Sequence, residues 1–340
     1  MSAPGDTQAN RLQPRSGGWW QNLVKLAVSA SLLWLILQRF SFEDLKAQVV
    51  HTQASALVLP FTVLVASNLL GALQWGWLLR AAGVVCRRGR LLGLYLAGLF
   101  FNNFWVGNVG GDVYKVVHLG RSAGAFGRVA GATLVDRIVG AAALCVLALV
   151  AAGAGLGSKR IPLGLALVVV GASLATVGAA GVLLHRDWGR WVQAALGRAP
   201  LGRLSARLVQ LCGYLGEYRE RGRVLHGVFL LSLVIQSARV LAHYCVGVAM
   251  GWTLHAADLG RFFLVIPVLG LVVALPISIN GWGVREWAGV ALFAPLGRGA
   301  AESVALLALT ASLAFVASLA GGVWFVVESW SWGRGGRGGR

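Results

Sequence analysis

Long apolar runs alternate with short polar segments along almost the whole chain. Most runs are long enough for a membrane-spanning helix, which needs about 20 apolar residues. Two other runs are shorter, and each leads into a glycine-rich segment that contains charged residues. The expected spans are residues 23–40, 54–79, 129–152, 161–184, 224–250 and 301–327, and the short runs are residues 91–105 and 262–275. The pattern predicts an all-α polytopic membrane protein.

The two glycine-rich segments interrupt the helical pattern in a similar way. We call residues 109–115 the first break and residues 280–286 the second break. Unpaired backbone groups persist in a membrane only where protein buries them or a wet cavity surrounds them. We therefore expect about six full spans and two re-entrant helical hairpins, although eight full crossings would leave the loops on the same sides. The two hairpins are expected to enter the membrane from opposite faces. Together with the match of Asn108 to Asn280, this suggests an inverted repeat.

Composition and charge agree with this class. Hydrophobic residues make up 57% of the chain and charged residues 12%, which leaves no room for a large soluble domain. The net charge of +18 does not indicate nucleic-acid binding, because lysine and arginine fall in short loops and one amphipathic segment. Loops of that kind lie in the cytoplasm by the positive-inside rule, so both termini are predicted to be cytoplasmic. The four cysteines have no metal-ligand spacing, and neither a metal nor another cofactor is expected.

The predicted organisation is one membrane domain between two tails. Residues 1–22 form a polar cytosolic tail, residues 23–328 the membrane domain, and residues 329–340 a Gly/Arg-rich cytosolic tail of disordered character. Within the domain, residues 186–223 form a basic segment with leucines at helical spacing. That segment fits an amphipathic helix on the anionic inner leaflet, or a packed cytoplasmic hairpin without a lipid role. The sequence does not separate these two readings.

Three ordered motifs resemble the membrane region of the lysylphosphatidylglycerol synthase family, also called flippase-like. They are Gly110-Gly111-Asp112 with Lys115, Val135-Asp136-Arg137-Ile138-Val139-Gly140, and Leu275-Pro276-Ile277-Ser278-Ile279-Asn280-Gly281-Trp282-Gly283-Val284-Arg285-Glu286. The resemblance implies a bacterial or archaeal inner-membrane protein whose relatives move aminoacylated phosphatidylglycerol between leaflets. About a dozen residues follow the last span, so the soluble aminoacyl-transfer domain is not expected, and neither is synthase activity.

Charged residues inside apolar segments are the candidates for binding, since charge is costly in hydrocarbon. Asp112 and Lys115 are three residues apart and share a helix face, so they are expected to form an ion pair. Neighbouring Asp136 and Arg137 point in different directions and need partners elsewhere, such as Arg285, Lys115 or Glu286. The predicted substrate-binding residues are Asp112, Lys115, Asp136, Arg137, Asn280, Arg285 and Glu286, with break glycines Gly110, Gly111, Gly281 and Gly283 and secondary candidates Tyr114, His118, Arg239 and His243.

Two roles stay open for these charges. Arginine suits bidentate phosphate contact, and Glu286 could bind a cationic amine or orient Arg285. Alternatively, the glycines permit close helix packing and the charges are structural bridges. We expect Lys115, Arg137, Arg285 and Glu286 to converge near the midplane.

Three function classes follow from this pattern. The first is a lipid translocase, of flippase or scramblase type, which moves a phospholipid through a charged intramembrane groove. The others are a secondary transporter of a small polar solute and a non-transporting membrane scaffold. No catalytic motif is present, so the chain is not expected to be an enzyme. Expected partners are membrane phospholipid as substrate and as anionic inner leaflet; a homo-oligomer or a partner lipid-modifying enzyme stays open.

Overall fold

The computed structural model describes residues 52–104, 109–157, 163–184, 213–218, 220–275 and 281–335, and these residues contain helices and no strands. The elements are η1 (Ala54–Leu57), α3 (Val58–Ala81), α4 (Arg88–Asn102), α5 (Gly110–Ser122), α6 (Phe126–Gly157), α7 (Leu163–Leu184), α10 (Gly222–Ala249), α11 (Ala256–Ala274), α12 (Val284–Phe293), η2 (Ala294–Leu296) and α13 (Ala300–Gly335). The all-α prediction is confirmed for this part of the chain.

Four of the described helices are long and apolar enough to cross a membrane. They are Ala54–Ala81, Phe126–Gly155, Gly222–Ala249 and Ala300–Glu328, and each coincides with a predicted span. The predicted span at residues 23–40 lies outside the described residues, as does most of the basic segment at residues 186–223. The structure therefore shows a helical membrane protein, while the count of six spans and the inverted repeat stay predictions.

The short apolar runs form the short helices that the sequence predicts. The first gives α4, which packs against α5 beyond the first break, and the second gives α11, which packs against α12 beyond the second break. Each break thus joins a pair of packed helices. Whether each pair enters and leaves on one side of the membrane stays a prediction.

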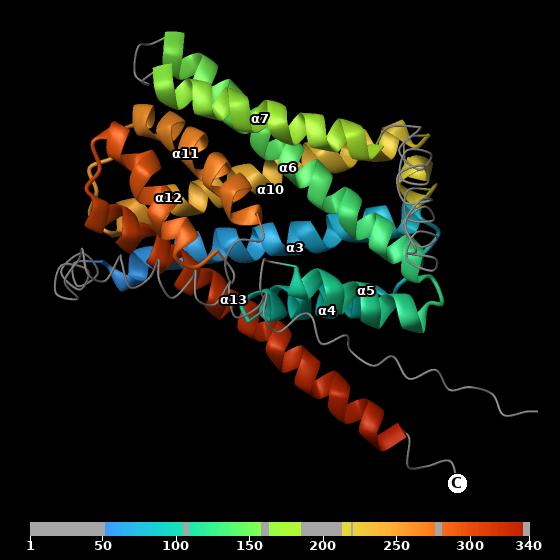
Figure 1. Ribbon diagram of the computed structural model, residues 1–340. Helices are drawn as coiled ribbons and strands as arrows, with labels where there is room; N and C mark the ends of the chain where they lie inside the picture. The colour runs from blue at the N-terminus through green and yellow to red at the C-terminus, as the bar shows by residue number, and fades with distance from the viewer. Residues whose placement is uncertain are drawn as a thin grey trace, which may run out of the picture.

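Helices α3 and α10 form the antiparallel centre of the molecule. The N–H of Gln53, just before η1, donates to the Ala249 carbonyl (3.2 Å), and the Tyr218 hydroxyl donates to the Leu78 carbonyl (2.8 Å). These two contacts mark opposite ends of the bundle. In Figure 1, α3 lies between the α4–α5 pair and the α6–α7 pair.

Two apolar clusters fill the interior, one around each break. The first surrounds the fully buried Trp75, whose indole N–H donates to Thr133 Oγ1 (3.1 Å). The second surrounds the fully buried Leu264 and Leu306. Because α6 and α10 contribute to both clusters, they hold the two breaks in a fixed relation.

The last helix is longer than predicted. Helix α13 continues to Gly335, whereas the apolar run predicted an end at residue 327. The polar residues after the apolar run do not end a helix by themselves, and glycine, a weak helix former, becomes frequent only from Gly333.

Candidate functional site at the two helix breaks

The first break brings the start of α5 against the end of α4. The Gly111 N–H donates to Asn102 Oδ1 (2.8 Å), so the last side chain of α4 satisfies a backbone donor of the first turn of α5. A Cβ atom at Gly111 would collide with the carbonyl oxygen of Gly98. Glycine at this position is therefore required by the close approach of two backbones.

Lys115 is a buried cation in the first turns of α5. It is only 5% exposed, its Nζ lies 2.9 Å from Asp112 Oδ1, and it stands 5.0 Å from the ring centres of both Trp75 and Tyr95. The predicted ion pair is confirmed. Both aromatic faces add cation–π attraction, which is stronger where water is excluded.

Arg137 of α6 reaches the same carboxylate from another helix. Its Nε donates to Asp112 Oδ2 at 2.6 Å, so one carboxylate faces two cations and the triad carries a formal charge of +1. The partner is Asp112, which the sequence analysis did not name for Arg137. The Arg137 side chain is 49% exposed, in contrast to Lys115.

Asp136 has a polar partner that sequence reasoning missed. Its Oδ1 accepts a hydrogen bond from Gln74 Nε2 (2.8 Å), and Gln74 Oε1 accepts one from the Ser232 hydroxyl (2.8 Å). The chain of bonds ties α6 to α3 and α10 in the apolar interior. Gln74 and Ser232 are polar residues in long apolar runs, which was the signal available in the sequence.

The second break is a tight turn with a self-contained ion pair. Gly281 and Gly283 have φ values of +74° and +81°, a backbone region that L side chains rarely adopt. Glu286 is 2% exposed; its Oε2 accepts the Gly283 N–H (2.7 Å), and its Oε1 accepts Arg285 Nε (2.9 Å) and Nη2. The proposed orienting role of Glu286 toward Arg285 fits this geometry. Asn280 lies outside the described residues.

Arg285 faces a cavity shared by elements from both breaks. Its guanidinium lies 4.8 Å from the centre of the Trp282 ring. The cavity has a volume of about 270 Å³, and its lining residues are Asn103, Trp282, Arg285, Ala311, Ala314 and Phe315. Asn103 caps the end of α4 and also donates to Ser318 Oγ on α13 (2.9 Å). One end of this mostly apolar cavity is thus cationic and aromatic.

The secondary candidates on α10 lie between the two breaks. Arg239 interacts electrostatically with Tyr95, a neighbour of Lys115, and Arg285 does so with His243. His243 Nδ1 lies 2.8 Å from the Arg239 carbonyl oxygen. The ion pairs shown at each break stay within it: Lys115 and Arg137 contact Asp112, and Arg285 contacts Glu286. The convergence of Lys115, Arg137, Arg285 and Glu286 stays a prediction.

We compared the sequence of this chain with known protein families. Residues 22–322 match the family described as the lysylphosphatidylglycerol synthase TM region. The chain belongs to that family. The match covers both breaks and confirms the resemblance read from the sequence motifs. Searches of curated proteins and of solved structures found no match.

In this member of the lysylphosphatidylglycerol synthase TM region family, Tyr114 and His118 join a polar cluster at the far end of α5. Their rings stack at 5.5 Å, and His118 Nε2 lies 3.7 Å from Glu328 Oε2 on α13. Arg90 Nε of α4 lies 3.8 Å from Glu328 Oε1. Sequence reasoning gave Glu328 no role, because only the tertiary packing brings α13 beside α4 and α5.

Proposed function

We propose that this chain is a lipid translocator that moves a phospholipid, or a related polar lipid, between leaflets through a charged groove beside the first break. Membership in a family of membrane regions from lipid-modifying enzymes supports a role in lipid metabolism. The step from that role to translocation rests on the charges of the first break.

The observation that carries the proposal is the exposure of Arg137 deep in a spanning helix. Arg137 lies 11 residues after Phe126, the first residue of α6. At 1.5 Å per residue, this is about 16 Å along the axis, close to half the roughly 30 Å hydrocarbon thickness. A cation at that depth persists where it meets water, a counter-charge or a polar ligand. Asp112 supplies one counter-charge, and the exposed half of the side chain can also meet a polar ligand.

The surroundings of Arg137 favour a lipid over an enclosed solute. Near Asp112, Val109 just before α5 and Val113 on α5 are exposed, and so is Phe104, which follows the end of α4. An exposed cation beside exposed apolar side chains suits a ligand with a phosphate headgroup and acyl chains. In this arrangement the phosphate meets Arg137, and the acyl chains stay against the apolar surface.

The Arg285 cavity favours a second candidate, a transporter of a small polar solute. Its volume of about 270 Å³ is near the lower limit of small-molecule pockets. Arg285 would bind an anionic group and Trp282 an apolar part. A solute carrier and a lipid translocator differ in whether the substrate is drawn from the bilayer or from water.

Leaflet exchange of fluorescent phospholipids in liposomes with purified protein tests the proposal. The expected result is headgroup-dependent exchange by the wild type that falls in Arg137→Ala. Arg128→Ala is the matched control, since Arg128 is an exposed arginine on the same helix as Arg137. Absence of exchange with every headgroup, at confirmed insertion, would contradict the lipid function and favour the solute transporter.

A further inference from the structure

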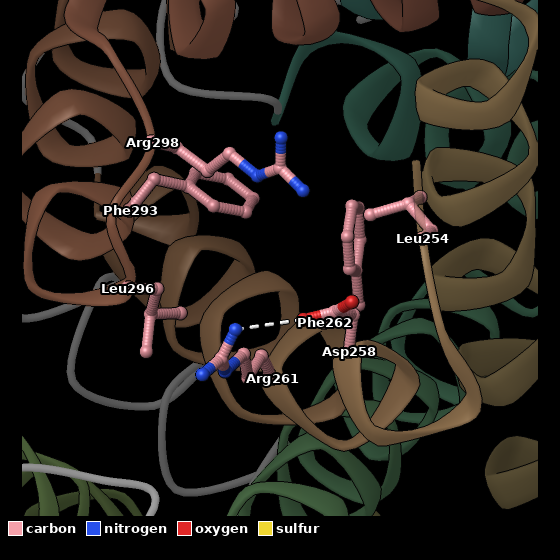
Figure 2. A pocket seen from close by; sticks show the side chains of 7 residues that line it. All are labelled: Leu254, Asp258, Arg261, Phe262, Phe293, Leu296 and Arg298. Carbon is pink, nitrogen blue, oxygen red and sulfur yellow. Dashed lines mark hydrogen bonds and ion pairs between the residues drawn. The ribbon is translucent and has the colours of Figure 1, made fainter. Parts of the chain in front are cut away.

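A second charged pocket lies at the end of the bundle that is marked by the Gln53–Ala249 contact. It is formed where the α10–α11 connection meets η2 and the start of α13. Figure 2 shows its lining, with two arginine side chains on opposite walls of the hollow: the residues are Leu254, Asp258, Arg261, Phe262, Phe293, Leu296 and Arg298. None of them belongs to the site at the breaks.

The pocket carries one net positive charge. Arg261 Nη1 donates to Asp258 Oδ1 at 2.7 Å, whereas the Arg298 guanidinium lies 4.5 Å from the Trp252 ring centre and makes no salt bridge within the described residues. Burial by itself raises the pKa of Asp258, but the hydrogen bond from the His255 N–H and the nearby arginines outweigh burial and lower this pKa. Asp258 is therefore ionised at neutral pH and neutralises only one of the two arginines.

Two donors near this pocket are buried and lack a hydrogen-bond partner in the part of the chain that the structure describes. They are Arg261 Nε and the indole Nε1 of Trp252. Buried donors are nearly always satisfied in folded proteins, by protein, water or a ligand. An oxyanion that enters the pocket would satisfy the Arg261 donor and meet the Arg298 guanidinium opposite.

The location of these arginines is not explained by loop charge alone. The other end of the bundle, near the Tyr218–Leu78 contact, holds exposed arginines at and beside the α3–α4 loop: Arg80, Arg87 and Arg88. Positive loops of that kind set topology and lie on the cytoplasmic side. Arg261 and Arg298 are at the opposite end and converge on one pocket from separate segments, which is typical of a binding site.

We propose that Arg261 and Arg298 form a phosphate-binding subsite for the headgroup of a phospholipid in the leaflet opposite the basic loops. The pocket has a volume of about 10 Å³, which is room for one oxygen atom, so one phosphate oxygen enters and the rest of the lipid stays outside. The naming of a lipid as the source of the phosphate rests on the proposed function; the oxyanion chemistry does not.

Native mass spectrometry of the full chain in detergent tests the subsite. The probe is short-chain phosphatidylglycerol, with inorganic phosphate and short-chain diacylglycerol as the two comparison ligands. The double variant Arg261→Ala/Arg298→Ala is expected to weaken the binding of one lipid about tenfold or more, because it loses one or two charge-assisted hydrogen bonds to the phosphate. The double lysine variant keeps the charge and is expected to lose less, and Arg87→Ala with Arg88→Ala is expected to bind as the wild type does.

Asp258→Asn separates binding from a structural role. The asparagine side chain still accepts the His255 N–H at the start of α11, while Arg261 loses its competing carboxylate. The subsite predicts tighter lipid binding by this variant. Weaker or unchanged binding by Asp258→Asn, or wild-type binding by the double alanine variant with a normal elution profile, would overturn the proposal.

Two further measurements separate a lipid phosphate from free phosphate, and the proposed subsite from the proposed translocation. Competition by inorganic phosphate at the concentration of the lipid, or equal binding of diacylglycerol, would overturn the assignment to a lipid phosphate. Arg137→Ala is expected to lower leaflet exchange and to leave the binding event at Arg261 and Arg298 intact. Exchange that survives Arg137→Ala contradicts the groove of the proposed function, while loss of the binding event in the double alanine variant still supports the subsite.

Discussion

The two breaks use the same kinds of residue in different ways. At the first break, Gly111 allows two backbones to touch, and Asp112 joins cations from two helices. At the second break, the glycines adopt positive φ, and Arg285 and Glu286 are neighbours that neutralise each other. The first break is thus a tertiary junction and the second a local turn. A similar sequence motif therefore does not imply a similar electrostatic site.

Loss of Asp112 should have the largest effect on stability. Asp112→Ala leaves Lys115 buried without its carboxylate, and such breakage costs about 3–5 kcal/mol. Glu286→Ala should cost less, because Arg285 borders a cavity into which its charge can turn. Thermal unfolding of both variants in detergent measures the difference. Equal losses would show that the first break is no more of a tertiary junction than the second.

A second substitution tests whether the unpaired charge of Lys115 causes the loss of stability in Asp112→Ala. Replacing Lys115 by Met in the Asp112→Ala background removes that charge and keeps side-chain volume against Trp75 and Tyr95. We expect most of the lost stability to return. No recovery would assign the loss to the carboxylate's contact with Arg137 instead.

Alanine substitutions at the glycines of the two breaks should destabilise the protein in different ways. Gly111→Ala drives Cβ into the Gly98 backbone, which cannot rotate away, so α4 and α5 must separate at a cost of about 1–3 kcal/mol or more. Gly283→Ala forces a positive φ on an L residue, at about 1–2 kcal/mol. Cysteine cross-linking between α4 and α5 is expected to report the separation in the first variant alone. A matching loss of cross-linking in Gly283→Ala would contradict this distinction.

Arg137→Ala should affect transport more than folding. Its side chain is half exposed, and Asp112 keeps Lys115 when Arg137 is removed. We expect the rate of leaflet exchange to fall about tenfold, which corresponds to roughly 1.4 kcal/mol of lost contact with the headgroup. The melting temperature should stay near that of the wild type. A variant that melts early and exchanges lipid normally would make Arg137 a structural clamp.

The smallest expected effect is a difference in thiol labelling rate, which also tests whether the two ends of the bundle lie on opposite sides of the membrane. Burial raises the pKa of the Cys86 thiol, which lies near the loop arginines, and this effect exceeds the lowering by Arg90. With the other cysteines replaced by serine, Cys86 should react more slowly with maleimide near pH 8 than an exposed Thr253→Cys at the opposite end, and its rate should keep rising at higher pH. In sealed vesicles the two thiols should label from opposite sides. Labelling from one side only would contradict the opposite-ends arrangement.

The sequence by itself determined the class and the location of the helices. Apolar runs of about 20 residues fix spanning helices because backbone groups must pair within each segment in lipid. The Asp112–Lys115 and Arg285–Glu286 contacts were also within reach of the sequence, since both link residues in one or two helical turns.

Only the tertiary structure decided the partners of Arg137, Asp136 and Glu328. Asp112 is 25 residues from Arg137, and Gln74 is 62 residues from Asp136. Helical spacing says which residues share a face but not which faces meet, because that depends on how α3, α5, α6, α10 and α13 pack as whole helices. Which charged groups meet at each break, and hence what each break can bind, follows from that packing.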